Sequence, residues 1–216
     1  MPSTDTVQPL KDVWLKPRRV FRELATSPIG ITDYLLAAAQ GIATSIALYR
    51  SQLAGTHIGA PEILGSSIMF GPVGGILSVF FFAAIYGRLG QGFGGTSSRN
   101  QVFHVLAYGG LPVAASLLLW AFTALLVGEA AIIETPALVD DGFVAFVLHV
   151  QFAAWVLLLL WSVVLQVMGL SEVMRLATLK AFAVYLLGQV LALLAALFLT
   201  ALIAILVPGI LPAGPH

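Results

Sequence analysis

Residues 63–86 read ILGSSIMFGPVGGILSVFFFAAIY and contain no formally charged side chain. As a helix, these 24 residues extend about 36 Å, which exceeds the roughly 30 Å thickness of a bilayer's hydrocarbon core. The stretch therefore predicts a helix that spans a membrane. Pro72 interrupts it, and a proline inside a helix frees a backbone carbonyl, so we expect a kink there.

Four further stretches are long and apolar enough to span a bilayer. They cover residues 31–49, 105–127, 144–168 and 181–207. The first is the shortest, because only 16 residues separate Asp33 from Arg50, and we expect both charged side chains to reach toward the headgroups. Pro112 predicts a second kink, within 105–127. The sequence thus predicts an all-α integral membrane bundle of five transmembrane helices.

The composition agrees with this interpretation. Of 216 residues, 59% are hydrophobic and 9% are charged, against about 25% charged in soluble domains. A soluble globule has no place to bury so much apolar surface, and a disordered chain carries more charge. Ten basic residues balance ten acidic ones, which gives no basic excess for nucleic acid. The absence of cysteine excludes disulfides and iron–sulfur clusters.

The distribution of basic residues predicts the orientation in the membrane. Nine of the ten fall on one side of the predicted spans, and Arg50 falls on the other. The nine are Lys11, Lys16, Arg18, Arg19, Arg22, Arg88, Arg99, Arg175 and Lys180. We therefore expect the N-terminus to be cytoplasmic and the tail at 208–216 to be external. Residues 1–26 contain no apolar core of a secretory signal, so the first span is expected to act as its own insertion signal.

A short amphipathic segment precedes the first span. We expect a flexible tail over 1–12 and an interfacial helix over about 13–26, with Trp14 just before Pro17 at its first turn. Helical spacing separates an apolar face from a basic face. The apolar face holds Val20, Phe21 and Leu24, and the basic face holds Arg18, Arg19 and Arg22. This predicts apolar side chains in the membrane and bases on anionic lipid or a partner protein; alternatively the bases only fix the topology.

The predicted spans carry few groups for chemistry. Spans two to five contain no acid, lysine or arginine at mid-depth, although such groups mark most transport and catalytic sites. His104 and His149 lie near span ends, and the glycine-rich loop 87–100 lacks the ending of a phosphate-binding loop, with Ser97 or Ser98 available to cap the next helix. We therefore predict no catalytic residue, no cofactor and no metal site. The acidic residues Glu129, Glu134, Asp140 and Asp141 are expected to form a solvated loop, with a divalent cation as the alternative.

Small residues predict how the helices pack, because close backbone approach drives helix association in lipid. The fifth span repeats a small residue every four positions, at Gly188, Ala192, Ala196, Thr200 and Ala204. Gly71 and Gly75 form a similar pair in the second span. Packing within one chain and packing in a homo-oligomer both remain open.

Three segments together resemble bacterial Yip-domain (Ypt-interacting-protein) membrane proteins. Residues 14–22, WLKPRRVFR, resemble the family's opening, and 94–112, GGTSSRNQVFHVLAYGGLP, resemble its glycine loop with an aromatic and a proline. Residues 161–187 resemble its closing block, in which an acid precedes the TLKA entry at 178–181. The family-pattern positions carried over are Trp14, Pro17, Arg18, Arg22, Gly95, Tyr108, Pro112, Glu172 and Lys180.

The resemblance implies a five-span bundle with a cytoplasmic N-terminus, in a bacterial inner membrane, with no assigned reaction. Eukaryotic relatives bind prenylated Rab GTPases, but their acidic Asp-Leu-x-Gly-Pro signature is missing here. Our leading hypothesis is a non-enzymatic scaffold or adaptor that presents its basic surface to lipid or a partner protein. The alternative is a channel or transporter for a neutral or lipid-like solute, with Tyr108, Gln166 and Gln189 lining a cavity. An intramembrane enzyme is the third hypothesis.

Overall fold

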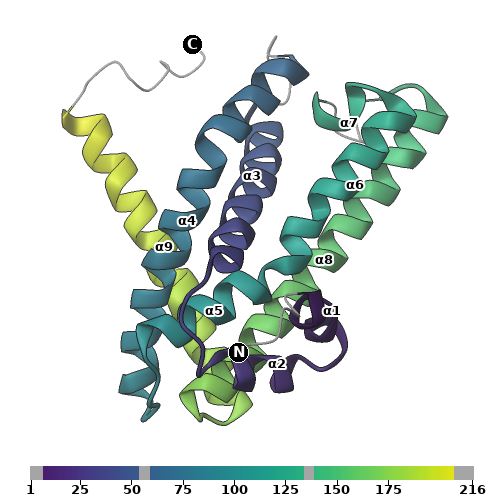
Figure 1. Cartoon of the computed structure of the whole chain (residues 1–216). Helices are drawn as coiled ribbons and strands as arrows, with labels where there is room; N and C mark the ends of the chain where they lie inside the picture. The colour runs from purple at the N-terminus through teal and green to yellow at the C-terminus, as the bar shows by residue number, and fades with distance from the viewer. Residues whose placement is uncertain (1–6, 54–58, 134–138, 207–216) are drawn as a thin grey trace.

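The computed structural model describes residues 7–53, 59–133 and 139–206. Every regular element in these ranges is a helix. The elements are α1 (Val7–Leu15), α2 (Pro17–Leu24), α3 (Ile31–Leu53), α4 (Ala60–Gly92), α5 (Arg99–Gly109), α6 (Leu111–Val127), α7 (Ala130–Ile133), α8 (Gly142–Met174) and α9 (Thr178–Leu206). Helices α3, α4 and α9 form one group and α6 with α8 the other, while α1, α2 and α5 lie near the end where the groups meet (Figure 1).

Five segments of the described chain are long and apolar enough to cross a membrane, which confirms the predicted number of spans. They are α3, α4, the pair α5–α6, α8 and α9. This chain is therefore an integral membrane protein with multiple spanning helices. The predicted tail at 208–216 lies outside the described residues.

The third span is broken two residues before Pro112, within the stretch where the sequence predicts a kink. Helix α5 ends at Gly109 and α6 begins at Leu111, so Gly110 is the break and Pro112 lies in the first turn of α6. Proline is tolerated there because its missing N–H would have no partner in the helix. The Gln40 amide of α3 donates to the Ala107 carbonyl at 2.7 Å, and a Cβ on Gly110 would collide with the Gln40 side chain. Helix α4, by contrast, continues through Pro72 without interruption.

The N-terminal segment also differs from the prediction. Helix α1 already begins at Val7, inside the expected tail, and the expected single helix is divided at Lys16. Pro17 explains the division, because proline disfavours the helical conformation of the residue before it, and Lys16 has φ −135° and ψ 51°. Val20 and Phe21 are buried against the protein rather than inserted in lipid. The two helices are thus part of the folded bundle.

Small residues bring α3 and α4 together, as the Gly71–Gly75 pair predicts. A Cβ on Gly75 would lie 2.7 Å from the Gly41 Cα, and a Cβ on Gly71 would lie 2.7 Å from the Ile42 Cα. Gly41 of α3 is the partner that the sequence pattern did not identify. This pair therefore serves packing within one chain.

The ridge of small residues on α9 contacts α4 at Gly188. Gly188 lies against the ring of Tyr86 in α4, where a Cβ would collide. Ala192 is half-buried and Ala196 is exposed, while the side chains of Thr200 and Ala204 lie outside the described residues. Next to Gly188, Gln189 donates to the Tyr86 hydroxyl at 2.7 Å, which adds a polar contact between α4 and α9.

Candidate functional site

Helix α2 is docked between α5 and α8 by one large side chain. Phe21 is fully buried, and its ring lies over Gly169 of α8, where a Cβ would come within 3.0 Å of it. The same Cβ would lie 2.6 Å from the Val105 methyl of α5. Gly169 therefore makes the space that α2 occupies. Helices α1 and α2, the 93–98 connection and the α8–α9 turn are called the basic cap below.

Polar contacts of family-pattern residues fix α2 to the α8–α9 turn. The Arg22 guanidinium donates to Glu172 at 2.6 and 2.8 Å, and Arg18 donates to the Thr178 hydroxyl at 3.3 Å. The structure thus brings together residues that are 150 and 160 positions apart in sequence. Arg19 instead bonds Glu23 at 2.8 Å on α2 itself, and this hydrogen bond raises the pKa of Arg19 above its ordinary value.

The glycine-rich connection packs against the end of α8. Thr96 N–H donates to the Met174 carbonyl at 3.2 Å, and a Cβ on Gly95 would lie 3.1 Å from that same oxygen. Ser98 then caps α5 by accepting from Gln101 N–H at 3.3 Å, as expected for one of the two serines. The Gln101 amide also donates to the Ala25 carbonyl at 3.1 Å, which ties the start of α5 to the end of α2.

Asp33 and His104 form a buried pair that the sequence analysis missed. We expected Asp33 to reach the headgroups and His104 to be a boundary residue, but they are 3% and 2% exposed. His104 Nδ1 lies 2.6 Å from Asp33 Oδ1, and Nε2 lies 3.0 Å from the Ser27 carbonyl. Because both ring nitrogens face acceptors, the arrangement suits a doubly protonated ring. Because the two side chains contact each other, the free-energy cost of burying them is partly offset.

Arg50 also differs from the prediction. Rather than extending to the headgroups, it is buried, with its guanidinium carbon 5.2 Å from the centre of the Trp120 ring. An arginine over an indole face gains a cation–π attraction, which offsets part of the cost of leaving water. Arg50 thus links α3 to α6.

Two polar residues of the channel hypothesis, Gln166 and Gln189, have different hydrogen-bond partners in the described part of the chain. Gln166 donates to the Ser162 hydroxyl at 3.1 Å, and Ser162 donates to the Gly109 carbonyl at 2.9 Å at the break in the third span. Gln189 is bonded to Tyr86 of α4. Tyr108 is buried within α5. These contacts give Gln166 and Gln189 separate structural roles.

The acidic loop is described only in part, since Glu134 lies outside the described residues. Asp141 caps α8 by accepting from the N–H groups of Phe143 and Val144 at 2.8 and 3.0 Å. Within the described ranges, His, Asp and Glu form no group of three that suits a metal ion.

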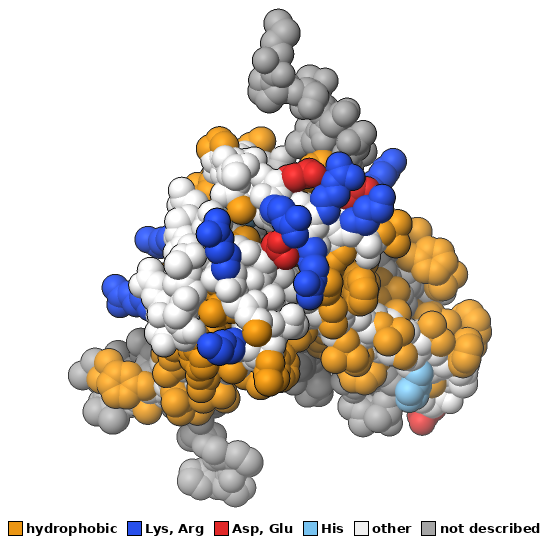
Figure 2. Space-filling view, turned by 90° about the horizontal axis from the view of Figure 1, so that it is seen from below, with side chains coloured by type: hydrophobic (Ala, Val, Ile, Leu, Met, Phe, Trp, Pro, Cys, Tyr) orange, Lys and Arg blue, Asp and Glu red, His pale blue; other side chains and the backbone are white. Residues whose placement is uncertain are grey.

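Basic side chains gather on the outer face of the basic cap, flanked by hydrophobic side chains (Figure 2). Beyond α2, the exposed bases in or next to the basic cap are Lys11, Lys16, Arg88, Arg99, Arg175 and Lys180. Arg175 follows Met174 directly, and Arg88 lies two residues before Gly90, against which the Met174 sulfur packs. Arg88, Arg175 and Lys180 are called the turn patch below.

Comparison with known proteins identifies the family. The family model described as Yip1 domain matches residues 11–211. Neither a curated protein nor a solved structure matches this chain. The match covers the basic cap from Lys11 onward and all five long apolar segments, so the chain belongs to the Yip1 domain family.

Proposed function

We propose that this protein is a non-enzymatic membrane scaffold whose turn patch binds an acidic surface of a partner protein. One observation carries the proposal: α2, the 93–98 connection and the α8–α9 turn are fastened to one another, and the exposed Arg88, Arg175 and Lys180 lie in or near them. A fastened surface loses little conformational entropy on binding, and charge complementarity speeds encounter with an acidic partner.

We further infer that the basic cap faces the cytoplasm of a bacterial cell, with the protein in the inner membrane. Nine of ten basic residues are in the cap or next to it. Positive residues are retained on the cytoplasmic side during insertion. The excess of positive charge on the cap therefore supports a cytoplasmic binding surface.

The turn patch is a better candidate than α2 for partner contact. Arg18 and Arg22 already bond Thr178 and Glu172, and Arg19 bonds Glu23. Arg88, Arg175 and Lys180 are exposed at the ends of three different helices. A partner on these three residues would contact α4, α8 and α9 at once.

Site-specific photocrosslinking in native membranes tests this proposal. A photoreactive side chain at Ala177, which is exposed between Arg175 and Lys180, should give one discrete adduct with a different protein. The combined changes Arg88→Gln, Arg175→Asn and Lys180→Gln should abolish that adduct. Asparagine suits the left-handed conformation at residue 175, where φ is 55°.

The matched control removes two bases elsewhere on the basic cap, with Lys11→Gln and Lys16→Gln. This variant should retain the adduct. An adduct that survives loss of the turn patch would contradict the proposal, as would no adduct at all. An adduct with a second copy of this chain would indicate that the turn patch mediates self-assembly rather than binding of another protein.

A further inference from the structure

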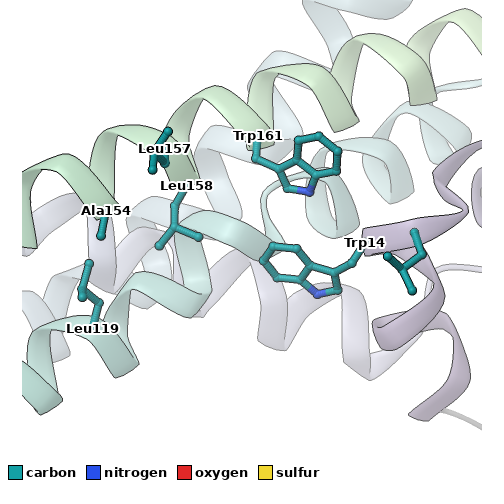
Figure 3. Close-up of a pocket in the computed structure, with 7 residues that line it drawn as sticks. Trp14, Leu119, Ala154, Leu157, Leu158 and Trp161 are labelled. Atoms are coloured by element: carbon teal, nitrogen blue, oxygen red, sulfur yellow. The ribbon is translucent and has the colours of Figure 1, made fainter.

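An apolar groove of about 520 Å³ opens between α1, α6 and α8. Its volume falls within the range typical of small-molecule sites, about 300–1,000 Å³. The side chains labelled in Figure 3 are Trp14, Leu119, Ala154, Leu157, Leu158 and Trp161. Leu15 of α1 and Leu157 of α8 are 84% and 66% exposed. The groove is thus open on its outer side and lies on a spanning helix, where lipid is the surrounding medium.

The two ends of the groove differ in chemistry. Figure 3 shows the indole rings of Trp14 and Trp161 at one end, with Leu119 and Ala154 at the other. Tryptophan prefers the membrane–water interface, whereas leucine and alanine suit the hydrocarbon core. The arrangement therefore fits an amphipathic occupant with its polar end at the tryptophans.

Helix length agrees with this placement. The 20 residues of α8 from Gly142 to Trp161 rise about 30 Å, which matches the hydrocarbon thickness of a bilayer. Asp140 and Asp141 precede this segment at one boundary. At the other end of this segment, Trp14 of α1 lies at the same end of the groove as Trp161 (Figure 3), and α1 also carries the charged residues Lys11 and Asp12. A bilayer placed on this segment would have the tryptophan end at its headgroup level.

Two lysines, Lys11 and Lys16, flank Trp14 along the chain and outnumber the one acid of this segment, Asp12. Lys11 lies three and four residues before Trp14 and Leu15 on α1, a spacing that places all three on one helix face. Lys16 follows Leu15 directly, and both lysines are exposed. Basic residues at headgroup level attract anionic lipids.

We propose that the groove binds a single anionic phospholipid, with one acyl chain between α6 and α8 and the phosphate at Lys11 and Lys16. The site is separate from the turn patch, so it stands whether or not a partner protein binds there. Trp14 then has a defined role: its ring forms the end wall of the acyl-chain site.

Native mass spectrometry of the full-length chain in neutral detergent tests the site. The probes are phosphatidylglycerol and phosphatidylcholine with identical acyl chains. We expect one retained lipid, with phosphatidylglycerol preferred by tenfold or more. Lys11→Gln with Lys16→Gln should lower that preference roughly tenfold to thirtyfold, since each surface base contributes modestly to anionic-lipid binding.

A matched pair of variants tests the acyl-chain half. Ala154 lines the groove, so Ala154→Phe should fill it and abolish retention of both lipids. Ala153 is exposed on the same helix outside the groove, so Ala153→Phe should retain lipid like the natural chain. Arg88→Gln with Lys180→Gln removes two bases away from the groove and should leave the preference unchanged.

Three outcomes would overturn the proposal. Equal retention of the two lipids by the natural chain would show that binding does not depend on an anionic headgroup. Equal loss of lipid retention in Ala153→Phe and Ala154→Phe would show that the groove is not the binding site. Recovery of a dimer that Ala154→Phe converts to monomer would assign the groove to a second copy of the chain.

Discussion

His104 and Asp33 hold α5 against the start of α3 through a buried contact of 2.6 Å between Nδ1 and Oδ1. Asp33 uses its other oxygen to accept from Gly30 N–H at 2.8 Å, so the carboxylate also caps α3. The His104 ring continues the chain of hydrogen bonds to the Ser27 carbonyl. One carboxylate thus fixes both the start of the first span and the helix that leads into the third.

Breaking this pair should destabilise the bundle strongly. Asp33→Asn or His104→Gln leaves a buried group without its charged partner, and such changes typically cost about 3–5 kcal/mol. Thermal unfolding in detergent should show a clearly lower midpoint for each variant. The double variant should lose less than the two single losses combined, because both remove one shared interaction.

His149→Gln is the control for this prediction, since His149 is exposed and bonds only the Ala145 carbonyl one turn away among the contacts described. Its midpoint should be close to that of the natural chain. Midpoints of Asp33→Asn and His104→Gln that also stay unchanged would contradict a stabilising role for the pair.

Some of these features were predictable from the sequence and others were not. Five spans were predictable because bilayer thickness fixes the length of an apolar run, as in residues 63–86. The Asp33–His104 pair was not, because its members are 71 positions apart and each one lies near a span end. The break at Gly110 falls where Pro112 predicted a kink, but its contact with Gln40 of another helix was not predictable. Contacts between distant segments, rather than local pattern, decided these cases.

The α3–α4 contact should tolerate no side chain at Gly75. Gly75→Val would place a side chain against the Gly41 backbone, and close approach of backbones is what holds these helices together. We expect loss of folded protein after extraction, measured by size-exclusion chromatography. Gly74 has no atom within 4 Å of a built Cβ, so Gly74→Val should behave like the natural chain. Equal behaviour of the two variants would show that this crossing is not needed for folding.

The space above Gly169 should decide whether α2 stays docked. Gly169→Val would displace the Phe21 ring, because its Cβ would lie within 3.0 Å of that ring. Trypsin should then cut faster at the arginines of α2, as seen by mass spectrometry of the fragments. Gly65→Val, at an exposed position with open space, serves as the control. Unchanged cleavage of α2 in Gly169→Val would rule out Phe21 as its anchor.

The Arg22–Glu172 pair should contribute modestly to stability, and exchanging the two charges should preserve the contact. The Arg22 side chain is 74% exposed and Glu172 is 18% exposed, and exposed pairs contribute about 0.2–1 kcal/mol. Arg22→Glu should increase tryptic cleavage at the neighbouring α2 arginines through repulsion from Glu172. Combining it with Glu172→Arg should restore protection. Protection that stays lost in the exchanged pair would mean that geometry rather than charge holds this contact.

Gln151 should be a position where a substitution stabilises the protein. Its side chain is buried in α8, and neither amide atom has a hydrogen-bond partner among the described residues. A buried amide without a partner costs about 1–3 kcal/mol on the scale of protein substitutions. Gln151→Leu keeps a similar volume and removes that cost, so its unfolding midpoint in detergent should rise. Gln189→Leu provides the contrast: its amide bonds the Tyr86 hydroxyl at 2.7 Å, so this change should lower the midpoint. If Gln151→Leu lowers it as well, the Gln151 amide has a bound partner, such as an ordered water, that the leucine displaces.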